Sequence, residues 1–496
     1  MLKRLHIVFL SILLSSVLSA SDGSKKLYIS TILAQAWKQT IGLFFQDYEF
    51  DRAYKAAQQK LEREIPSAIQ TYKILNANSE NPFALTIGLS MSQITQTNNT
   101  INPEFLSEQL HKIAQQQKDP EKWLDARKGY LHAYPRFQWT QQHWQAMVDQ
   151  LECLKLFDQS GVQSGLPTNR ISLEIADFLQ DGSTDIDSVK LQSLVANVRK
   201  MKNPLLCMHH YTNPLSNPHM FEQNTDIALF ATYCSEFMKV YVGSMTEQER
   251  AEKEICICPM SQPVAFGLRV AYQQNLPPFM CNIDRAQFLQ NIADANIMAA
   301  WQIKKQNPNA KVLFSHQFKP FKQVHGKIHP KYALESLVCY IADKMYNGQF
   351  INMFKNHQDC FDGIALSVYP SGHFDGTNYT QDNCSGQLDP QGFLEAIVMA
   401  HKAFETKDIY IVETGCNTFN QDTKKKFIDM MLYVCQLARE MGISVKMCSL
   451  WGQMDEPYYE WEHVGRSYFG YFDSLDISNP CASINDGGRY IQEILK

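Results

Sequence analysis

Short apolar runs and helix-like stretches alternate over most of the chain. From Trp144 onward, stretches whose apolar residues recur at helical spacing are separated by short, continuous apolar runs. Such runs are typical of strands that are covered on both faces, as in parallel sheets with helices outside. Strands are therefore expected at 170–177, 204–210, 254–259, 311–315, 362–368, 409–412 and 444–450. Helices are expected to begin at Trp144 and to cover 186–200, 228–242, 286–305, 332–345, 393–404 and 424–441.

An eighth strand is expected near the N-terminus, at Leu27–Ile32. Alternating strands and helices imply a parallel sheet, and eight units close a (β/α)₈ barrel, or TIM barrel. Residues 47–139 are polar and helix-like and show no apolar β pattern, so we expect them to form a helical insertion on this α/β scaffold. No linker sets off a second domain, so residues 21–496 are expected to form one barrel domain.

The N-terminal segment Met1–Ala20 has the pattern of a signal peptide. Lys3 and Arg4 precede an apolar run at 7–18, which is followed by small residues and the polar stretch 21–26. The run is too short to span a bilayer comfortably, and no later run reaches the roughly 18 apolar residues that a spanning helix needs. We therefore expect an exported protein, periplasmic or secreted, with a retained anchor as the alternative.

Charge and cysteine content exclude some classes of partner. The formal net charge of −5 is small for 496 residues, and no Lys/Arg run is present, so nucleic acid and anionic membranes are poor partners. The thirteen cysteines are scattered and contain no Cys-x-x-Cys pair. They allow one or two disulfides of open pairing, leave at least one thiol unpaired, and give little support for a metal site. No cofactor is indicated.

Polar and aromatic residues gather at the expected strand ends, where barrels of this kind build their active sites. Glu413 ends the apolar run at 409–412 and is followed at once by Gly415. Each residue alone also fits a structural role, such as a core histidine or a salt-bridge arginine. Hydrogen-bonding groups mixed with flat rings suit a sugar, and their coincidence on successive strands is the signal. The residues are Gln35, Arg170, His210, Ser261, Gln262, Tyr369, Glu413, Trp451, Glu460 and Trp461.

Several of these residues lie in motifs that resemble glycoside hydrolase family 1, the β-glucosidases and their relatives. The similarity covers roughly residues 144–473, and its main segments are Asn169–Ile175, Met208–Pro214, Ala365–Tyr369 and Ile411–Gly415. The resemblance implies that Glu413 is the nucleophile and that Tyr369 positions it. It also implies that Gln35, Arg170, His210, Ser261, Trp451, Glu460 and Trp461 bind the sugar.

Two positions depart from the family pattern at the centre of its chemistry. The family's Asn-Glu-Pro, which supplies the general acid/base, corresponds here to Ser261-Gln262-Pro263, and Ser367 stands where the family has Asn. A glutamine amide has no proton to transfer at physiological pH. The plant thioglucosidases (myrosinases) of the same family are similar in carrying Gln at this position. The chain is also two residues longer before Glu460, and its long link after the first strand predicts that the insertion lies over the barrel mouth.

The resemblance implies an exported, β-glucosidase-like retaining hydrolase of O- or S-linked β-glycosides with impaired acid/base catalysis. Its partner would be a carbohydrate or glycoside, and it would need neither a cofactor nor a metal. Asp455 or Glu456 could replace the missing acid. A non-catalytic barrel that binds a glycan or serves as a scaffold is the main alternative. A barrel of another glycosidase family with its own acid is a third. The sugar and the oligomeric state remain open.

Overall fold

The computed structural model divides into two compact units, residues 1–64 and 65–496. In the first unit, residues 49–64 are described, and they contain a helix over 49–61. The predicted signal peptide lies outside the described residues. The described ranges are 49–77, 80–90, 111–112, 114–115, 119–121, 140–157, 165–211, 213–214, 216–273, 282–323, 333–374, 379–380, 388–405, 407–455 and 468–496.

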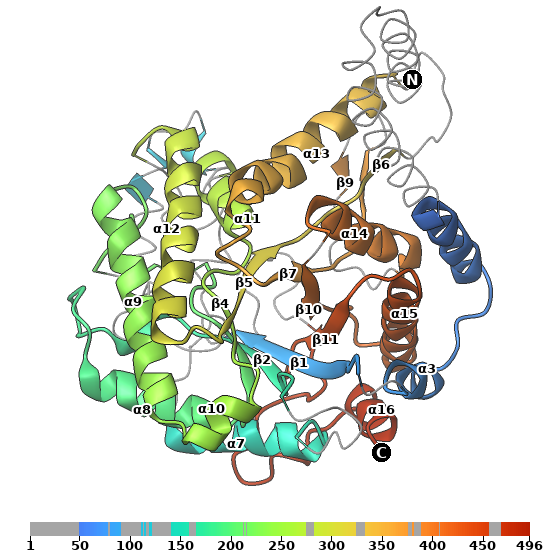
Figure 1. The fold of residues 1–496 in the computed structure, drawn as a ribbon, viewed down its shortest axis with the longest axis horizontal. Coiled ribbons are helices and arrows are strands. Elements are labelled where there is room, and N and C mark those ends of the chain that lie inside the picture. The colour runs from blue at the N-terminus through green and yellow to red at the C-terminus, as the bar shows by residue number, and fades with distance from the viewer. Residues whose placement is uncertain are drawn as a thin grey trace, which may run out of the picture. The chain divides into compact units, whose positions relative to one another are not determined.

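Eight parallel strands of the second unit close a barrel, in the order β1-β11-β10-β7-β5-β4-β3-β2. Figure 1 shows these strands enclosed by helices. The arrangement confirms the predicted (β/α)₈ barrel and seven of its predicted strands. The barrel strands are β1 (Ala84–Ser90), β2 (Asn169–Ser172), β3 (Pro204–Cys207), β4 (Cys256–Cys258), β5 (Lys311–His316), β7 (Gly363–Ser367), β10 (Asp408–Thr414) and β11 (Val445–Trp451). A separate small sheet contains β6 (Phe321–Gln323), β8 (Gly372–Phe374) and β9 (Tyr379–Thr380).

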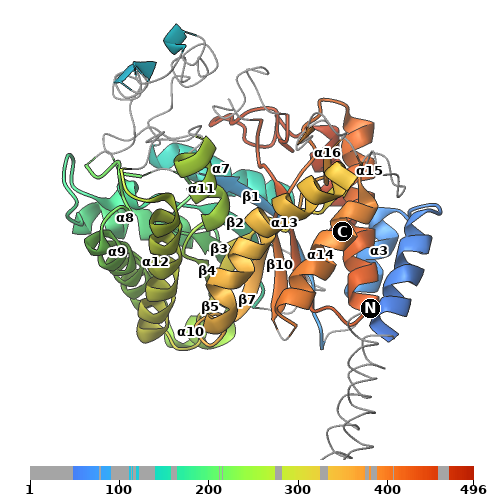
Figure 2. The same cartoon turned by 90° about the horizontal axis from the view of Figure 1, so that it is seen from above.

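Helices surround the barrel, with α9 packed along α12 on one side and α14 along α15 on another (Figure 2). Their apolar faces cover the outer surface of the strands, as the helical spacing predicted. None of the helices in the described ranges is long and apolar enough to cross a membrane. The helices are α3 (Ala68–Leu75), α7 (Gln141–Cys153), α8 (Ser188–Arg199), α9 (Asn224–Gly243), α10 (Glu247–Glu252), α11 (Pro263–Leu268), α12 (Arg285–Gln306), α13 (Ala333–Phe354), α14 (Pro390–Ala403), α15 (Gln421–Glu440) and α16 (Asp486–Ile494).

The first barrel strand is not where the sequence pattern placed it. β1 pairs with β11 and β2 and completes the closed barrel, so the prediction of Leu27–Ile32 as the first strand is wrong. The reason lies in the composition of β1, whose leucines and isoleucine alternate with Ala84, Thr86, Gly88 and Ser90. Small residues suit this face because a Cβ on Gly88 would lie 3.0 Å from the Trp451 ring. Leu27–Ile32 itself lies outside the described residues.

The predicted insertion at 47–139 is corrected in part, because it contains β1 and the helix α3 that precedes it. The Ala68 backbone N–H donates to the Asp429 carboxylate of α15 at 2.6 Å, and the Arg439 guanidinium donates to the carbonyl groups of Leu75 and Asn81. These contacts make residues 65–90 part of the barrel wall. Most of 91–139 lies outside the described residues, so an insertion over the mouth stays a prediction.

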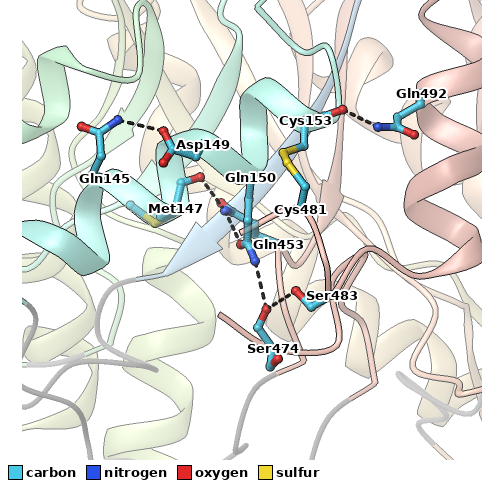
Figure 3. The surroundings of a disulfide bond; sticks show 10 residues. All are labelled: Gln145, Met147, Asp149, Gln150, Cys153, Gln453, Ser474, Cys481, Ser483 and Gln492. Carbon is cyan, nitrogen blue, oxygen red and sulfur yellow. Dashed lines mark hydrogen bonds between the residues drawn. A yellow bond between two sulfur atoms is a disulfide. The ribbon is translucent and has the colours of Figure 1, made fainter. Parts of the chain in front are cut away.

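A disulfide, Cys153–Cys481, joins the end of α7 to the segment before α16 (Figure 3). Beside it, the Gln453 amide donates to the Met147 carbonyl at 2.9 Å and to Gln150 Oε1 at 3.0 Å. The disulfide and these hydrogen bonds hold α7 against the chain that leaves β11. The described cysteines outside this pair are reduced and buried, and they include Cys256 and Cys258, which point together into the barrel core.

His316, at the end of β5, makes the stability of the fold depend on pH. Its ring stacks on Phe350 with centroids 4.3 Å apart, and burial lowers its pKa to about 3. The folded protein therefore holds a neutral ring at pH values where an unfolded histidine, with a pKa near 6.5, takes up a proton. This contribution to stability is complete above pH 6.5 and declines as the pH falls toward 3.

We expect His316→Phe to make unfolding less sensitive to acid. Between pH 7.5 and pH 5, the free energy of unfolding of the variant should fall by roughly 2 kcal/mol less than that of the native protein. Urea unfolding at both pH values measures the difference. His357→Gln, at an exposed histidine, is the matched control and should leave the pH dependence unchanged. Equal acid sensitivity of His316→Phe and the native protein would contradict the assignment.

Candidate functional site

The carboxylate of Glu413 is held in place at the end of β10. The Tyr369 hydroxyl, two residues beyond β7, donates to Glu413 Oε1 at 2.9 Å. Arg170 Nη1, from β2, lies 3.6 Å from Glu413 Oε2. The pairing of β10 with β7 shifts register between Ile411 and Glu413, which changes the direction of the strand at this point. Glu413 is thus buried and oriented from two sides at the mouth of the barrel.

Arg170 connects the ends of several strands. It is 1% exposed, and its Nη2 lies 3.4 Å from Ser261 Oγ and 3.5 Å from His210 Nδ1. Its guanidinium carbon also lies 4.7 Å from the centre of the Trp451 ring, within cation–π range. A buried arginine needs such partners, since an uncompensated charge would be costly to bury. One side chain therefore fixes the relative positions of residues from β2, β3, β4, β10 and β11.

His210 follows β3 and presents a neutral ring to the site. Burial, followed by the charge of Arg170, lowers its pKa well below the ordinary value. Its Nδ1 faces the Arg170 guanidinium and, at 3.0 Å, the Ser172 hydroxyl. A guanidinium only donates, so Nδ1 accepts and Nε2 carries the proton. The ring lies 5.7 Å from the Trp451 ring, and its backbone N–H donates to Glu174 Oε1 at 3.1 Å.

The two positions that depart from the family pattern are in contact. Gln262 Nε2 donates to Ser367 Oγ at 2.9 Å, across 105 residues of sequence. Gln262 is buried and stands immediately before α11 with a left-handed backbone, φ 43° and ψ 62°, which is uncommon for a residue other than glycine. Such outliers cluster at functional sites, where the surrounding structure holds them. The Gln262 amide thus presents a fixed hydrogen-bond donor at this position.

Trp451 ends β11 and forms the apolar wall of the site. Its ring belongs to a buried cluster with Tyr369 and Phe469. A Cβ on Gly415 would lie 2.7 Å from both the Trp451 carbonyl oxygen and the Phe469 ring, so the residue after Thr414 must be small. Gly88 leaves room for the indole ring. A flat aromatic surface therefore lies beside Tyr369 and Arg170, the two residues that contact the Glu413 carboxylate.

Seven of the ten predicted site residues lie at the barrel mouth and are linked by the contacts given above. Gln35, Glu460 and Trp461 lie outside the described residues. Asp455, considered as a substitute acid, accepts the Gly470 backbone N–H at 2.9 Å, and Glu456 is not described. In the described ranges, no group of three or more His, Cys, Asp or Glu side chains could hold a metal ion. The seven residues are Arg170, His210, Ser261, Gln262, Tyr369, Glu413 and Trp451.

The sequence pattern missed Glu174, a carboxylate two residues beyond β2. Glu174 is fully buried and accepts the His210 backbone N–H, so it helps to position the histidine. Its position inside an otherwise apolar run, Leu173 to Ala176, was a usable signal, because a charged residue is rarely fully buried without a specific partner.

Comparison with known proteins supports the fold alone. No protein-family model matches the sequence, and no curated protein matches it. Solved structures similar to this chain include the β-glycosidase from Pyrococcus horikoshii, with a TM-score of 0.61 and 16% identity over 85% of this chain and 95% of that one. The β-glucosidase from Thermotoga maritima in complex with glucoimidazole has a TM-score of 0.59 and 13% identity over 83% and 97%. The virulence factor SghA with its substrate analog salicin has a TM-score of 0.62 and 13% identity over 86% and 98%.

Proposed function

We propose that this protein is a retaining β-glycosidase of the family 1 type, with Glu413 as nucleophile and no general acid at Gln262. The observation that carries the proposal is the double fixation of the Glu413 carboxylate by Tyr369 and Arg170. A protein that only binds glycans has no need of an attacking carboxylate held in this way. The similarity to solved β-glycosidases and the family motifs in the sequence support the same assignment.

The sugar is held by groups around the nucleophile. The Nε2–H of neutral His210 donates to a hydroxyl, and the Trp451 ring covers an apolar face of the sugar. The position predicted for Gln35, after the first barrel strand, is better matched by Gln93, which follows β1 by three residues in the sequence. We therefore propose Gln93 in place of Gln35 as a sugar ligand, together with Glu460 and Trp461.

The chemistry follows from one carboxylate and one amide. A Glu413 oxygen attacks the anomeric carbon, and the bond to the leaving group breaks with its electron pair on the leaving atom. Gln262 supplies no proton, so the leaving group departs as an anion. In the second step, water displaces Glu413 from the anomeric carbon and loses its proton to solvent. Substrates are therefore glycosides of stable anions, such as thiolates and activated phenolates.

A non-catalytic, glycan-binding barrel is the second candidate function. The Gln262–Ser367 hydrogen bond favours it, because Gln262 stands where the family has its general acid/base and Ser367 stands where the family has Asn. In such a protein the amide would hold a sugar hydroxyl, and Glu413 would act as a hydrogen-bond acceptor.

We also propose that the protein is exported, to a periplasm or outside the cell. The basic start and apolar run of the first 20 residues support this location. The Cys153–Cys481 disulfide gives independent support, since disulfides persist mainly in oxidising compartments.

Covalent labelling tests the proposed function without knowledge of the natural substrate. We expect a 2,4-dinitrophenyl 2-deoxy-2-fluoro-β-glucoside to release dinitrophenolate in a burst and to leave a stable glycosyl ester. Intact-mass analysis and peptide mapping should place one adduct on Glu413. The fluorine slows both steps, but a good leaving group keeps the first step faster than the second. An unmodified protein after prolonged incubation with the gluco, galacto and manno analogues would favour the binding function instead.

A further inference from the structure

Gln317 stands directly after β5, beside the end of β7. Side chains of a strand alternate between the two faces of the sheet. Leu313 lies in the barrel core, so Ser315 shares its inward direction. The intervening residues face the surrounding helices, as shown by the His316 ring stacked on Phe350 of α13. β5 pairs with β7 up to His316 and Leu366, so Gln317 follows this pair at the level of Ser367.

The amide of Gln317 contains a buried donor without a partner. Gln317 is 7% exposed, and its Oε1 lies 3.5 Å from the Tyr346 hydroxyl, which donates to it. In the described part of the chain, nothing accepts a hydrogen bond from Gln317 Nε2. Leaving a buried donor unsatisfied is costly, and native proteins rarely do so. An oxygen acceptor on a ligand would remove this cost.

The position of Gln317 in the barrel indicates which part of a ligand it meets. β5 lies between β4 and β7 in the barrel. Gln262 follows β4, and Ser367 is the last residue of β7. Gln262 occupies the position where a glycosidase of this type meets the leaving group. Gln317 stands level with Ser367, the hydrogen-bond partner of Gln262, and so adjoins the leaving-group side of the site. The charges of Arg269 and Glu413 both act on the Tyr346 hydroxyl, which is consistent with this position.

We propose that Gln317, oriented by Tyr346, determines specificity by donating a hydrogen bond to an oxygen acceptor on the leaving group. This inference rests on the proposed glycosidase site. A leaving group with a carbonyl or carboxylate oxygen would pair with Nε2, and one without an acceptor would leave the donor buried and unpaired. A hydrogen bond of this kind is worth about a factor of ten in affinity.

Binding of matched C-glycosides, whose bond to the anomeric carbon cannot be hydrolysed, tests the inference without turnover. The probes are phenyl C-β-glucosides that carry an acetyl group at the ortho, meta or para position. The controls carry an isopropenyl group, which has the same shape but lacks the carbonyl oxygen. Calorimetry should show that the native protein binds at least one acetyl compound about tenfold more tightly than its isopropenyl partner. Gln317→Leu should abolish this preference and bind the isopropenyl compounds as the native protein does.

Two further measurements keep the result decisive. Gln317→Glu replaces the donor with an acceptor, so it should reverse the preference. Gln317→Leu should melt at the same or a higher temperature than the native protein, because the variant removes an unsatisfied donor. The inference would be overturned if Gln317→Leu lost affinity tenfold for both compounds of a pair. It would also be overturned if the native protein showed no preference, or if it bound none of the probes. Labelling of Glu413 decides the proposed reaction separately. An adduct on Glu413 without a Gln317-dependent preference refutes only the inference. A Gln317-dependent preference without an adduct on Glu413 refutes only the reaction.

Discussion

Replacing Gln262 by glutamate is expected to raise the hydrolysis rate of glycosides with poor leaving groups by about 10²–10⁴-fold, the usual contribution of general acid–base catalysis. The surroundings of Gln262 can accommodate a carboxyl group. Gln262 Nε2 now donates to the Ser367 hydroxyl, and a carboxylate there would accept a hydrogen bond from the same hydroxyl. The side-chain length is unchanged, so the carboxyl group should occupy the position of the amide. Steady-state rates with alkyl and dinitrophenyl glycosides measure the effect.

The pH profile of the Gln262→Glu variant should become bell-shaped. Its acid limb would report ionisation of Glu413, and its alkaline limb would report loss of the proton from the new glutamate. The negative charge of Glu413 should raise the pKa of the new group, because two like charges at close range disfavour each other. The native protein should lack the alkaline limb in this pH range.

The matched control is Gln262→Met, which keeps the length and removes both hydrogen-bonding atoms. It should show no gain with poor leaving groups. Azide, a nucleophile that needs no base, should accelerate turnover of the native protein and of Gln262→Met, whose second step is slow. Equal native rates for alkyl and dinitrophenyl glycosides would show that another residue supplies the proton.

Replacing Glu413 by alanine is expected to remove turnover almost completely, with a loss of about 10⁴-fold or more, as for other covalent nucleophiles. The fluoroglycoside should then leave the mass of the protein unchanged. The variant also creates space beside Tyr369 and Arg170, both of which contact the native carboxylate. A small anion such as azide could enter this space, where Arg170 provides a positive charge.

The stereochemistry of the azide product separates the two roles. In the native protein, azide attacks after Glu413, so two displacements give a β-glycosyl azide. In Glu413→Ala, azide attacks the substrate directly, and one displacement gives an α-glycosyl azide. NMR of the products distinguishes the two anomers. A β-azide from Glu413→Ala, or undiminished turnover by this variant, would show that the nucleophile is another residue.

The barrel could be predicted because most of its strands are short apolar runs, as at 409–412 and 444–450. β1 escaped this criterion because Ala84, Thr86 and Gly88 alternate with its leucines and isoleucine. Those residues are small because the Trp451 ring occupies the space beside Gly88, across the β1–β11 pair. A contact between residues more than 360 positions apart has no local signature. The sequence alone therefore indicated most of the barrel strands, but it did not indicate why β1 departs from their apolar pattern.

The same limit applies to the site. Strand-end position indicated Glu413 and His210, because parallel strands bring their carboxyl ends to one face, whereas Arg170 was indicated by the family resemblance. The Gln262–Ser367 pair and the unsatisfied amide of Gln317 depend on three-dimensional distances instead. Each looks unremarkable in sequence: a glutamine, a serine and a second glutamine. Their roles become visible only when the structure shows which atoms lie within hydrogen-bond distance of each other.

The disulfide between Cys153 and Cys481 converts most of the barrel into a covalent ring. Seven of the eight barrel strands, from β2 to β11, lie within the 328 residues that separate the two cysteines. A protease that cuts any loop inside this ring opens it but releases no fragment. The two pieces stay tethered at a high effective concentration, so their strands can pair again without a search through solution. For an exported protein, a single cleavage would then leave one molecule that separates into two only after reduction.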